Sequence, residues 1–238
     1  MRLDVYLVES GLFESRNRAI EAIKRGKVFI KGRVAKPSTL CDNSSDIFIE
    51  EEKFLVSRSA KKLELFFEDY PMNVKDKVAL DIGSSTGGFS QILLEKGVES
   101  VDCVDVGKEQ LHNFIKTNPK VRSFEGQDIR DFISDRRYNL IVSDVSFISL
   151  LYILDSVDRL GDSDCDIILL FKPQFEVGKE VSRDSKGVVK DQKAIINAQE
   201  RFEQSVKKIG WRLIFCCNSR LSGKSGNIEI IYYLKKGL

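Results

Sequence analysis

Residues 80–97 read LDIGSSTGGFSQILLEKG, and this stretch decides the fold. The apolar run that leads into it, 78–80, predicts a buried strand, which Asp81 closes. Small residues then fill positions 83–88, and from Phe89 onward apolar residues recur at helical spacing. The sequence therefore predicts a strand, a tight turn and a helix, an arrangement in which a ligand can reach backbone N–H groups.

Two common phosphate-binding motifs do not fit this turn. A P-loop requires lysine after its last glycine, where Phe89 stands. A dinucleotide-binding turn requires glycine two residues after Gly83, where Ser85 stands. Residues 223–225, Gly-Lys-Ser, are not a P-loop either, because Asn218 occupies the place of its first glycine. The turn suits a ligand with less phosphate, and a glycine-rich turn without a ligand is the alternative.

The bulk composition predicts a soluble, cytoplasmic protein with one large domain, or one large and one small. The chain has 238 residues, of which 42% are hydrophobic and 31% charged. It contains no apolar run long enough to span a bilayer, and its N-terminus lacks a signal-peptide core. The five cysteines include no C-x-x-C pair, so we expect reduced, structural thiols and no metal site.

The charge is distributed unevenly along the chain. Residues 1–40 contain nine Lys or Arg and four Asp or Glu, a net charge of +5, whereas the remainder carries −3. A basic head on a mildly acidic body predicts contact between the head and a polyanion, although a solvated basic face is the alternative. The basic residues in question are Arg2, Arg16, Arg18, Lys24, Arg25, Lys27, Lys31, Arg33 and Lys36.

From residue 78 onward, predicted strands and helices alternate. The strands are expected at 78–82, 101–105, 121–124, 139–143, 166–171, 212–217 and 228–234. The helices are expected at 88–96, 108–116, 147–157 and 191–208. This alternation predicts an α/β fold with a doubly wound parallel sheet that binds its ligand beyond the carboxyl ends of the strands. The seven strands resemble the methyltransferase version of the Rossmann fold.

Polar residues mark the ends of these strands. Asp105 lies about 20 positions past the glycine-rich turn, where an acidic residue suits ribose hydroxyls, with an ordinary loop carboxylate as the alternative. Asp128 could accept a hydrogen bond from an adenine amino group. Asp144 follows an apolar run, and Lys172 closes another, held extended by Pro173. A lysine in that place either snorkels from the core edge or has a function.

The first 50 residues resemble the S-four (alpha-L) RNA-binding domain. The resemblance rests on Arg2-Leu3-Asp4, Ser15-Arg16, Gly26-x-Val28 and Lys36-Pro37. It implies docking on folded RNA, chiefly by phosphate contacts. We therefore expect a small α+β domain at 1–52, a linker at 53–58 and a methyltransferase domain at 59–238.

Four residues resemble the Lys-Asp-Lys-Glu tetrad of the FtsJ-like ribose 2′-O-methyltransferases: Lys62, Asp144, Lys172 and Glu229. Together with the N-terminal domain, five motifs resemble the TlyA (hemolysin A) family across nearly the whole chain: VSRSAKKLE at 56–64, DIGSSTGGF at 81–89, SDVSFISL at 143–150, FKPQFE at 171–176 and GVVKD at 187–191. The family pattern before the first lysine has two glycines that are missing here. Lys61 is therefore an alternative to Lys62, although the spacing from Ser57 to Leu63 favours Lys62.

The resemblance implies transfer of a methyl group from S-adenosyl-L-methionine to a cytidine 2′-OH in ribosomal RNA. Lys172 would take the hydroxyl proton or orient the hydroxyl, Asp144 and Glu229 would hold Lys172, and Lys62 would balance their charge. Arg58 is expected on RNA, and the polar segment 176–191 is expected to form a mobile loop over the site. The implied cofactor-binding residues are Asp81, Gly83, Ser84, Ser85, Thr86, Gly87, Gly88, Phe89, Asp105, Val106, Gln127, Asp128 and Asp144.

Three other functions compete with this interpretation: a membrane-active hemolysin, a non-catalytic RNA-binding assembly factor and a small-molecule methyltransferase. The sequence offers no strongly amphipathic basic helix for the first. The intact tetrad argues against the second, and the basic head argues against the third. The chain begins directly at the RNA-binding domain, as in short family members, which favours 23S rRNA of the 50S subunit with 16S rRNA as a second target. We expect a monomer and, by resemblance, sensitivity to capreomycin-type drugs.

Overall fold

The computed structural model describes residues 1–50 and 53–237, and the chain divides into two compact units, 1–54 and 55–238. The predicted end of the first domain, residue 52, lies outside the described residues. The expected linker overlaps a helix, because Ser57 is the N-cap residue of α3 (Arg58–Asp69).

The first unit is a small α+β domain. Its elements are α1 (Leu3–Glu9), α2 (Arg16–Lys24), β1 (Val28–Ile30), β2 (Arg33–Val34) and β3 (Ile47–Ile49), and the strands form an antiparallel sheet in the order β2-β1-β3. Ser15 caps α2 by accepting a hydrogen bond from the Arg18 amide. Lys31 and Gly32 turn the hairpin with φ of 49° and 71°. Leu12 lies beyond α1 and is 51% exposed.

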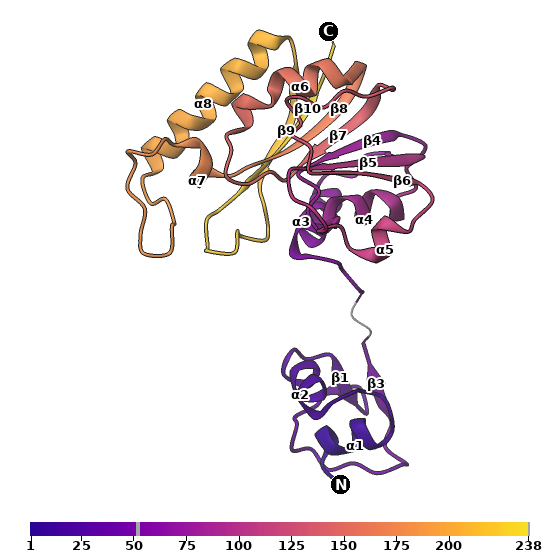
Figure 1. Ribbon diagram of the computed structural model, residues 1–238. Helices are drawn as coiled ribbons and strands as arrows, with labels where there is room; N and C mark the ends of the chain where they lie inside the picture. The colour runs from indigo at the N-terminus through magenta and orange to yellow at the C-terminus, as the bar shows by residue number, and fades with distance from the viewer. Residues whose placement is uncertain (51–52, 238) are drawn as a thin grey trace. The chain divides into compact units, whose positions relative to one another are not determined.

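The second unit contains, within the described residues, a seven-stranded mixed sheet (Figure 1). In spatial order its strands are β6 (Val121–Glu125), β5 (Ser100–Asp105), β4 (Val78–Ile82), β7 (Tyr138–Ser143), β8 (Gly161–Phe171), β10 (Ile230–Lys235) and β9 (Arg212–Asn218). The first five are parallel, and β10 runs antiparallel to both of its neighbours. The predicted doubly wound α/β fold is confirmed.

Helices cover both faces of this sheet (Figure 1). On one face lie α3, α4 (Gly88–Glu95) and α5 (Asn113–Lys116); on the other lie α6 (Leu154–Leu160) and α8 (Gln192–Ile209). Successive strand residues point to opposite faces, so Leu140 and Val142 join the cluster under α3 and α4, whereas Ile141 joins the cluster under α6 and α8. Both faces are therefore dry, as a parallel sheet requires.

Two predicted helices are shorter than expected. The helix expected at 108–116 is confined to α5, because the Glu125 carboxylate accepts the amides of Gln110 (2.7 Å) and Leu111 (3.1 Å) and Glu109 has a φ of 55°. The helix expected at 147–157 is divided into a 3₁₀ turn, η1 (Leu150–Tyr152), and α6. Phe147 has a φ of 66°, in the left-handed region, so it cannot be the first residue of a right-handed helix.

The close approach of α3 to α4 depends on Gly88. A Cβ atom at this position would collide with the hydroxyls of Ser57 and Ser59 and would lie 2.8 Å from the Ala60 amide nitrogen. Glycine thus lets the start of α4, next to the small-residue turn, pack against the first turn of α3, which carries Lys62.

Replacement of Gly88 by alanine should therefore destabilise the second unit by about 1–3 kcal/mol, because the added methyl group overpacks this contact. The free energy of unfolding in urea measures the change. Gln204→Ala, on the exposed face of α8, is the matched control and should leave the stability within about 0.5 kcal/mol of the wild type. A Gly88→Ala protein as stable as the control would show that α3 and α4 are not packed this closely.

Candidate active site

The sheet topology brings residues from distant parts of the chain to one edge. Asp144 follows β7 and Lys172 follows β8, and these two parallel strands are neighbours, so their carboxyl ends lie side by side. Glu229 immediately precedes β10, which is antiparallel to β8 and pairs Ile230 with Phe171. The start of β10 therefore lies at the same edge as the end of β8.

The predicted tetrad residues meet there as a chain of alternating charges. Glu229 pairs with the Lys62 ammonium at 2.6 Å, and Lys62 lies 3.9 Å from one Asp144 oxygen. The other Asp144 oxygen pairs with Lys172 at 2.7 Å. The side chains of Glu229, Lys172, Lys62 and Asp144 are only 3%, 8%, 9% and 12% exposed. Two cations and two anions thus neutralise each other in a nearly dry place.

The structure distinguishes between the two candidate lysines on α3. Lys62 is buried and contacts both carboxylates, whereas Lys61 is 44% exposed and pairs with Glu64 on the same helix. The geometry therefore assigns Lys62 to the cluster.

The expected contact between Glu229 and Lys172 is wrong. In the described contacts Glu229 is paired with Lys62, and Lys172 is held by Asp144 and Ser146. The Lys172 ammonium donates to the Ser146 hydroxyl at 2.8 Å and to the Asp144 carbonyl at 3.3 Å, in addition to its ion pair. Two hydrogen bonds and one ion pair therefore fix the position of the Lys172 ammonium.

The small-residue turn is shaped by left-handed backbone and close packing. Gly83 has a φ of 73°, and a Cβ atom there would lie 2.9 Å from Val145 Cγ1. Ser85 has a φ of 46°, and its amide donates to Asp105 Oδ2 at 2.8 Å. The other Asp105 oxygen accepts the Gly107 amide at 2.7 Å. Asp105 therefore fixes the turn from the neighbouring strand.

Behind the turn, several of the expected cofactor residues serve the scaffold. Asp81 is buried, and its Oδ2 accepts hydrogen bonds from both the amide and the hydroxyl of Ser90. Its burial raises the pKa of the carboxyl group to about 7. Phe89 packs in the core, and Gly88 contacts α3. Ser84, Thr86 and Gly87 shape the turn by backbone hydrogen bonds.

A cavity of 1270 Å³ opens beside the turn and reaches the tetrad residue Asp144. Seven of the predicted cofactor residues line it: Gly83, Ser85, Asp105, Val106, Gln127, Asp128 and Asp144. The Asp128 carboxylate is already engaged by Arg130 at 2.6 Å, and this hydrogen bond lowers the pKa of Asp128. Asp128 therefore stays ionised, but its oxygens are shared with a neighbouring guanidinium.

Sequence reasoning missed an aromatic pair at this cavity. Phe147 is 90% exposed in spite of its size and positive φ, and its ring lies 5.1 Å from that of Phe175. Glu176 is buried and fixes the same loop, because its carboxylate accepts hydrogen bonds from the Ser149 hydroxyl and the Leu150 amide. An exposed, strained aromatic side chain at a cavity mouth suits stacking on a planar ligand. The signal was present in the motif SDVSFISL, but exposure is not visible in a sequence.

The basic residues of the first unit fall into two groups. Arg2 and Arg16 both pair with the buried Asp4, whose pKa is lowered by the hydrogen bond from Arg2. Three others also form ion pairs: Arg18 with Glu14, Arg25 with Glu21 and Lys27 with Glu50. The remaining four are exposed and form no ion pair within the described part of the chain: Lys24, Lys31, Arg33 and Lys36. These four are available to a polyanion.

Comparisons with known proteins agree with this architecture. The model of the FtsJ-like methyltransferase family matches residues 55–236, and the model of the S4 domain matches residues 1–59. A Campylobacter jejuni protein named 23S rRNA (cytidine-2′-O)-methyltransferase TlyA is 43% identical over 99% of this chain and 100% of its own length. The chain belongs to the TlyA family. It is an enzyme of the methyltransferase class.

Other family members are similar over nearly the whole chain. A Mycobacterium tuberculosis protein named 16S/23S rRNA (cytidine-2′-O)-methyltransferase TlyA is 36% identical over 98% of this chain and 89% of its own length. A solved structure from Streptococcus thermophilus, provisionally named a hemolysin, matches with a TM-score of 0.73 and 31% sequence identity. The match covers 100% of this chain and 88% of the Streptococcus thermophilus chain. Among the described residues, no helix is long and apolar enough to cross a membrane.

The buried pair of Lys62 and Glu229 gives a direct test of this geometry. Lys62→Met should destabilise the protein by about 3–5 kcal/mol, because it leaves the Glu229 carboxylate buried without its cation. The double variant Lys62→Met/Glu229→Leu should recover much of that loss, since neither charge is then buried. Urea unfolding of the wild type, both single variants and the double variant measures the coupling. Additive effects would show that the two side chains do not interact.

Proposed function

We propose that this enzyme transfers the methyl group of S-adenosyl-L-methionine to the 2′-hydroxyl of a cytidine in ribosomal RNA. We further propose 23S rRNA in the 50S subunit as the preferred substrate, with 16S rRNA as a second target. The observation that carries the proposal is the position of the alternating tetrad: Asp144 belongs both to the tetrad and to the wall of the cavity that the small-residue turn borders.

The residues around the cavity suit this cofactor. Asp81 lies behind the turn and outside the cavity lining, but its Oδ1 is buried and has no hydrogen-bond partner among the described residues, so we propose that it accepts the ammonium of an amino-acid moiety. Asp105, at the end of β5, still has lone pairs for ribose hydroxyls, and Gln127 and Asp128 lie where the base would be read. When bound, the cofactor supplies an activated methyl group on a sulfonium.

The chain's own residues then position the nucleophile. A ribose hydroxyl must meet the methyl group in line, and Lys172 can hold its oxygen by exchanging the hydrogen bond to Ser146 for one to the substrate. As the oxygen gains the methyl group, the hydroxyl proton passes to the Asp144–Lys172 pair. Lys62 and Glu229 neutralise each other, so together they add no net charge beside the Asp144–Lys172 pair. Phe147 offers its exposed ring to the base of the target nucleotide.

The first unit supplies affinity for the RNA backbone. Lys24, Lys31, Arg33 and Lys36 are exposed and have no acidic partner in the described residues, which suits phosphate contacts. We propose that the enzyme works as a monomer in the cytoplasm and docks on the ribosomal subunit through this face.

Loss of the Lys172 ammonium should stop the reaction without affecting cofactor binding. Lys172→Ala should lower the rate of methyl transfer by about 10²–10⁴-fold, the range for a lost acid–base or positioning group. Lys172 does not line the cavity, so calorimetry should give a nearly unchanged cofactor Kd. Lys61→Ala, on the exposed side of α3, is the matched control. If Lys172→Ala instead loses cofactor binding, the lysine is structural and the proposed chemistry is wrong.

Cofactor affinity should depend on pH through Asp81. Its pKa of about 7 means that the carboxyl group becomes protonated and neutral as the pH falls below that value, so it no longer pairs with an ammonium. The affinity should fall by up to about tenfold per pH unit as the pH drops below 7. Asp81→Asn should bind more weakly at pH 8 and show no such dependence. A wild-type affinity that does not change between pH 6 and 8 would contradict this role.

A further inference from the structure

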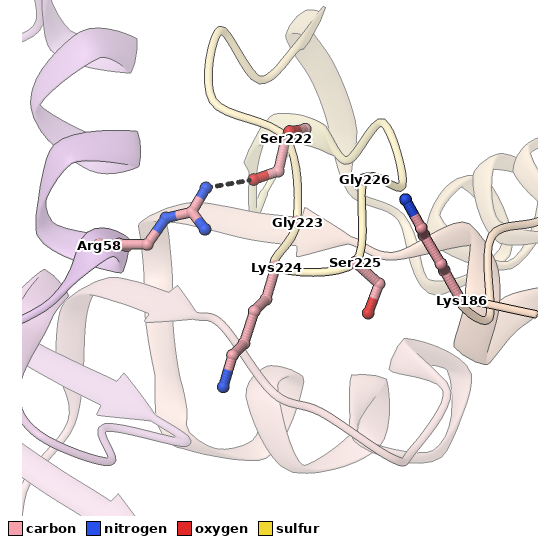
Figure 2. A pocket seen from close by; sticks show the side chains of 7 residues that line it. All are labelled: Arg58, Lys186, Ser222, Gly223, Lys224, Ser225 and Gly226. Carbon is pink, nitrogen blue, oxygen red and sulfur yellow. Dashed lines mark hydrogen bonds between the residues drawn. The ribbon is translucent and has the colours of Figure 1, made fainter.

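A second pocket, of 730 Å³, lies in the methyltransferase unit beside the turn that precedes β10 (Figure 2). Its walls come from the start of α3, from the loop before α8 and from the turn before β10. The lining residues are Arg58, Lys186, Ser222, Gly223, Lys224, Ser225 and Gly226. No acidic side chain is among them, so the pocket is strongly cationic.

The three cations of this pocket come from separate segments and are not neutralised. All three are exposed, and Figure 2 shows Arg58 and Lys186 on opposite sides of the turn that carries Lys224. Arg58 donates to the Ser222 carbonyl at 3.2 Å, which orients its guanidinium along the turn. Within the described chain, neither Lys186 nor Lys224 forms an ion pair, whereas half of the other lysines of this unit do. Three unpaired cations in one pocket repel each other unless an anion is bound.

The pocket is built on a fixed scaffold. The buried Asn227 accepts the Val189 amide at 3.0 Å and donates to the Gly187 carbonyl at 3.1 Å, which joins the loop to the turn. Within the turn, the Gly223 amide donates to the Asn227 carbonyl and the Gly226 amide donates to the Gly223 carbonyl. Asn227 thus contacts the segment 176–191, which we expected to be a mobile loop, near its end, at Gly187 and Val189.

The pocket adjoins the tetrad at two points. Arg58 precedes Lys62 by four residues on α3, so the two lie about 6 Å apart along the helix axis. A Cβ atom on Gly223 would lie 2.7 Å from Glu229 Oε1, so the turn passes directly over that carboxylate. An anion in the pocket would therefore lie next to the part of the tetrad formed by Lys62 and Glu229.

We infer that this pocket binds a backbone phosphate of the substrate RNA next to the methylated nucleotide. The inference rests on the proposed function, because it places the phosphate relative to the target ribose. Arginine and lysine with backbone amides around a glycine-rich turn are the donors that phosphate groups use. The role of such a contact is to fix the register of the RNA, so that one 2′-hydroxyl reaches the tetrad.

Two readouts test this site. Lys186→Gln/Lys224→Gln should raise the KM for ribosomal subunits about tenfold and reduce the slope of log affinity against log salt concentration by about one to two. The cofactor Kd should not change. Lys208→Gln, an exposed lysine near the end of α8 and outside the pocket, removes a similar charge and should leave all three quantities unchanged. An active double variant with wild-type KM and salt slope would overturn the inference.

Lysine footprinting separates this inference from the proposed function. An amine-reactive reagent is applied to the full-length protein, free and in a sedimented complex with 30S or 50S subunits, and mass spectrometry reads each lysine. Lys186 and Lys224 should be protected in the complex, whereas Lys208 should not. Protection without any methyl transfer would support the phosphate site and contradict the proposed reaction. Lack of protection in the complex would overturn the phosphate site, whether or not the enzyme is active.

Discussion

Neutralisation of buried charge at one edge of the sheet is the constraint on which the rest of the structure depends. Two lysines and two carboxylates lie there with little access to water, and each would be strongly unfavourable alone. The cluster is stable only if α3, β7, β8 and β10 all deliver their residues to the same place. A site of this kind therefore requires the whole fold of the second unit to be correct. Lys62 and Glu229, for example, lie far apart in the sequence and form an ion pair only in the folded unit.

The same constraint links the scaffold to the chemistry. The antiparallel insertion of β10 between β8 and β9 lets Glu229 reach the carboxyl edge from the start of a strand rather than from its end. Gly88 lets α3, which carries Lys62, approach the start of α4, which follows the small-residue turn. In the proposed reaction these polar groups are displaced little when a hydroxyl enters, because Lys172 exchanges one hydrogen-bond acceptor for another. The site is organised before any substrate arrives.

Much of this could be predicted from the sequence. Hydrophobic periodicity and glycine positions predicted the strands of the sheet, the turn at 83–88 and the ends of most strands. These features could be predicted because each depends on residues close together in the sequence. The four tetrad positions came from motif resemblance, and their meeting point follows from strand order. The pairing within the tetrad was predicted incorrectly, because which carboxylate faces which lysine depends on side-chain packing. Arg2 and Arg16 were expected on RNA but neutralise Asp4, whose burial the sequence did not reveal.

The helices that were mispredicted and the residues that were missed have a common cause. The segment 108–112 has helical composition, but Glu125 from the next strand captures its amides, which is a tertiary effect. Phe147 lies in the apolar motif SDVSFISL, and only the structure shows its positive φ and its 90% exposure. Lys186 and Lys224 lie 38 residues apart in the sequence, and only the structure shows that hydrogen bonds of Asn227 join their two segments.

The identity of the methylated product tests the central claim most directly. The purified protein would be incubated with S-adenosylmethionine carrying a labelled methyl group and, separately, with unmodified 30S and 50S subunits, and the RNA then digested to nucleosides. The account predicts label in 2′-O-methylcytidine, chiefly from the 50S subunit. Label on a base, on another ribose, or in neither subunit, from protein that binds the cofactor, would contradict it.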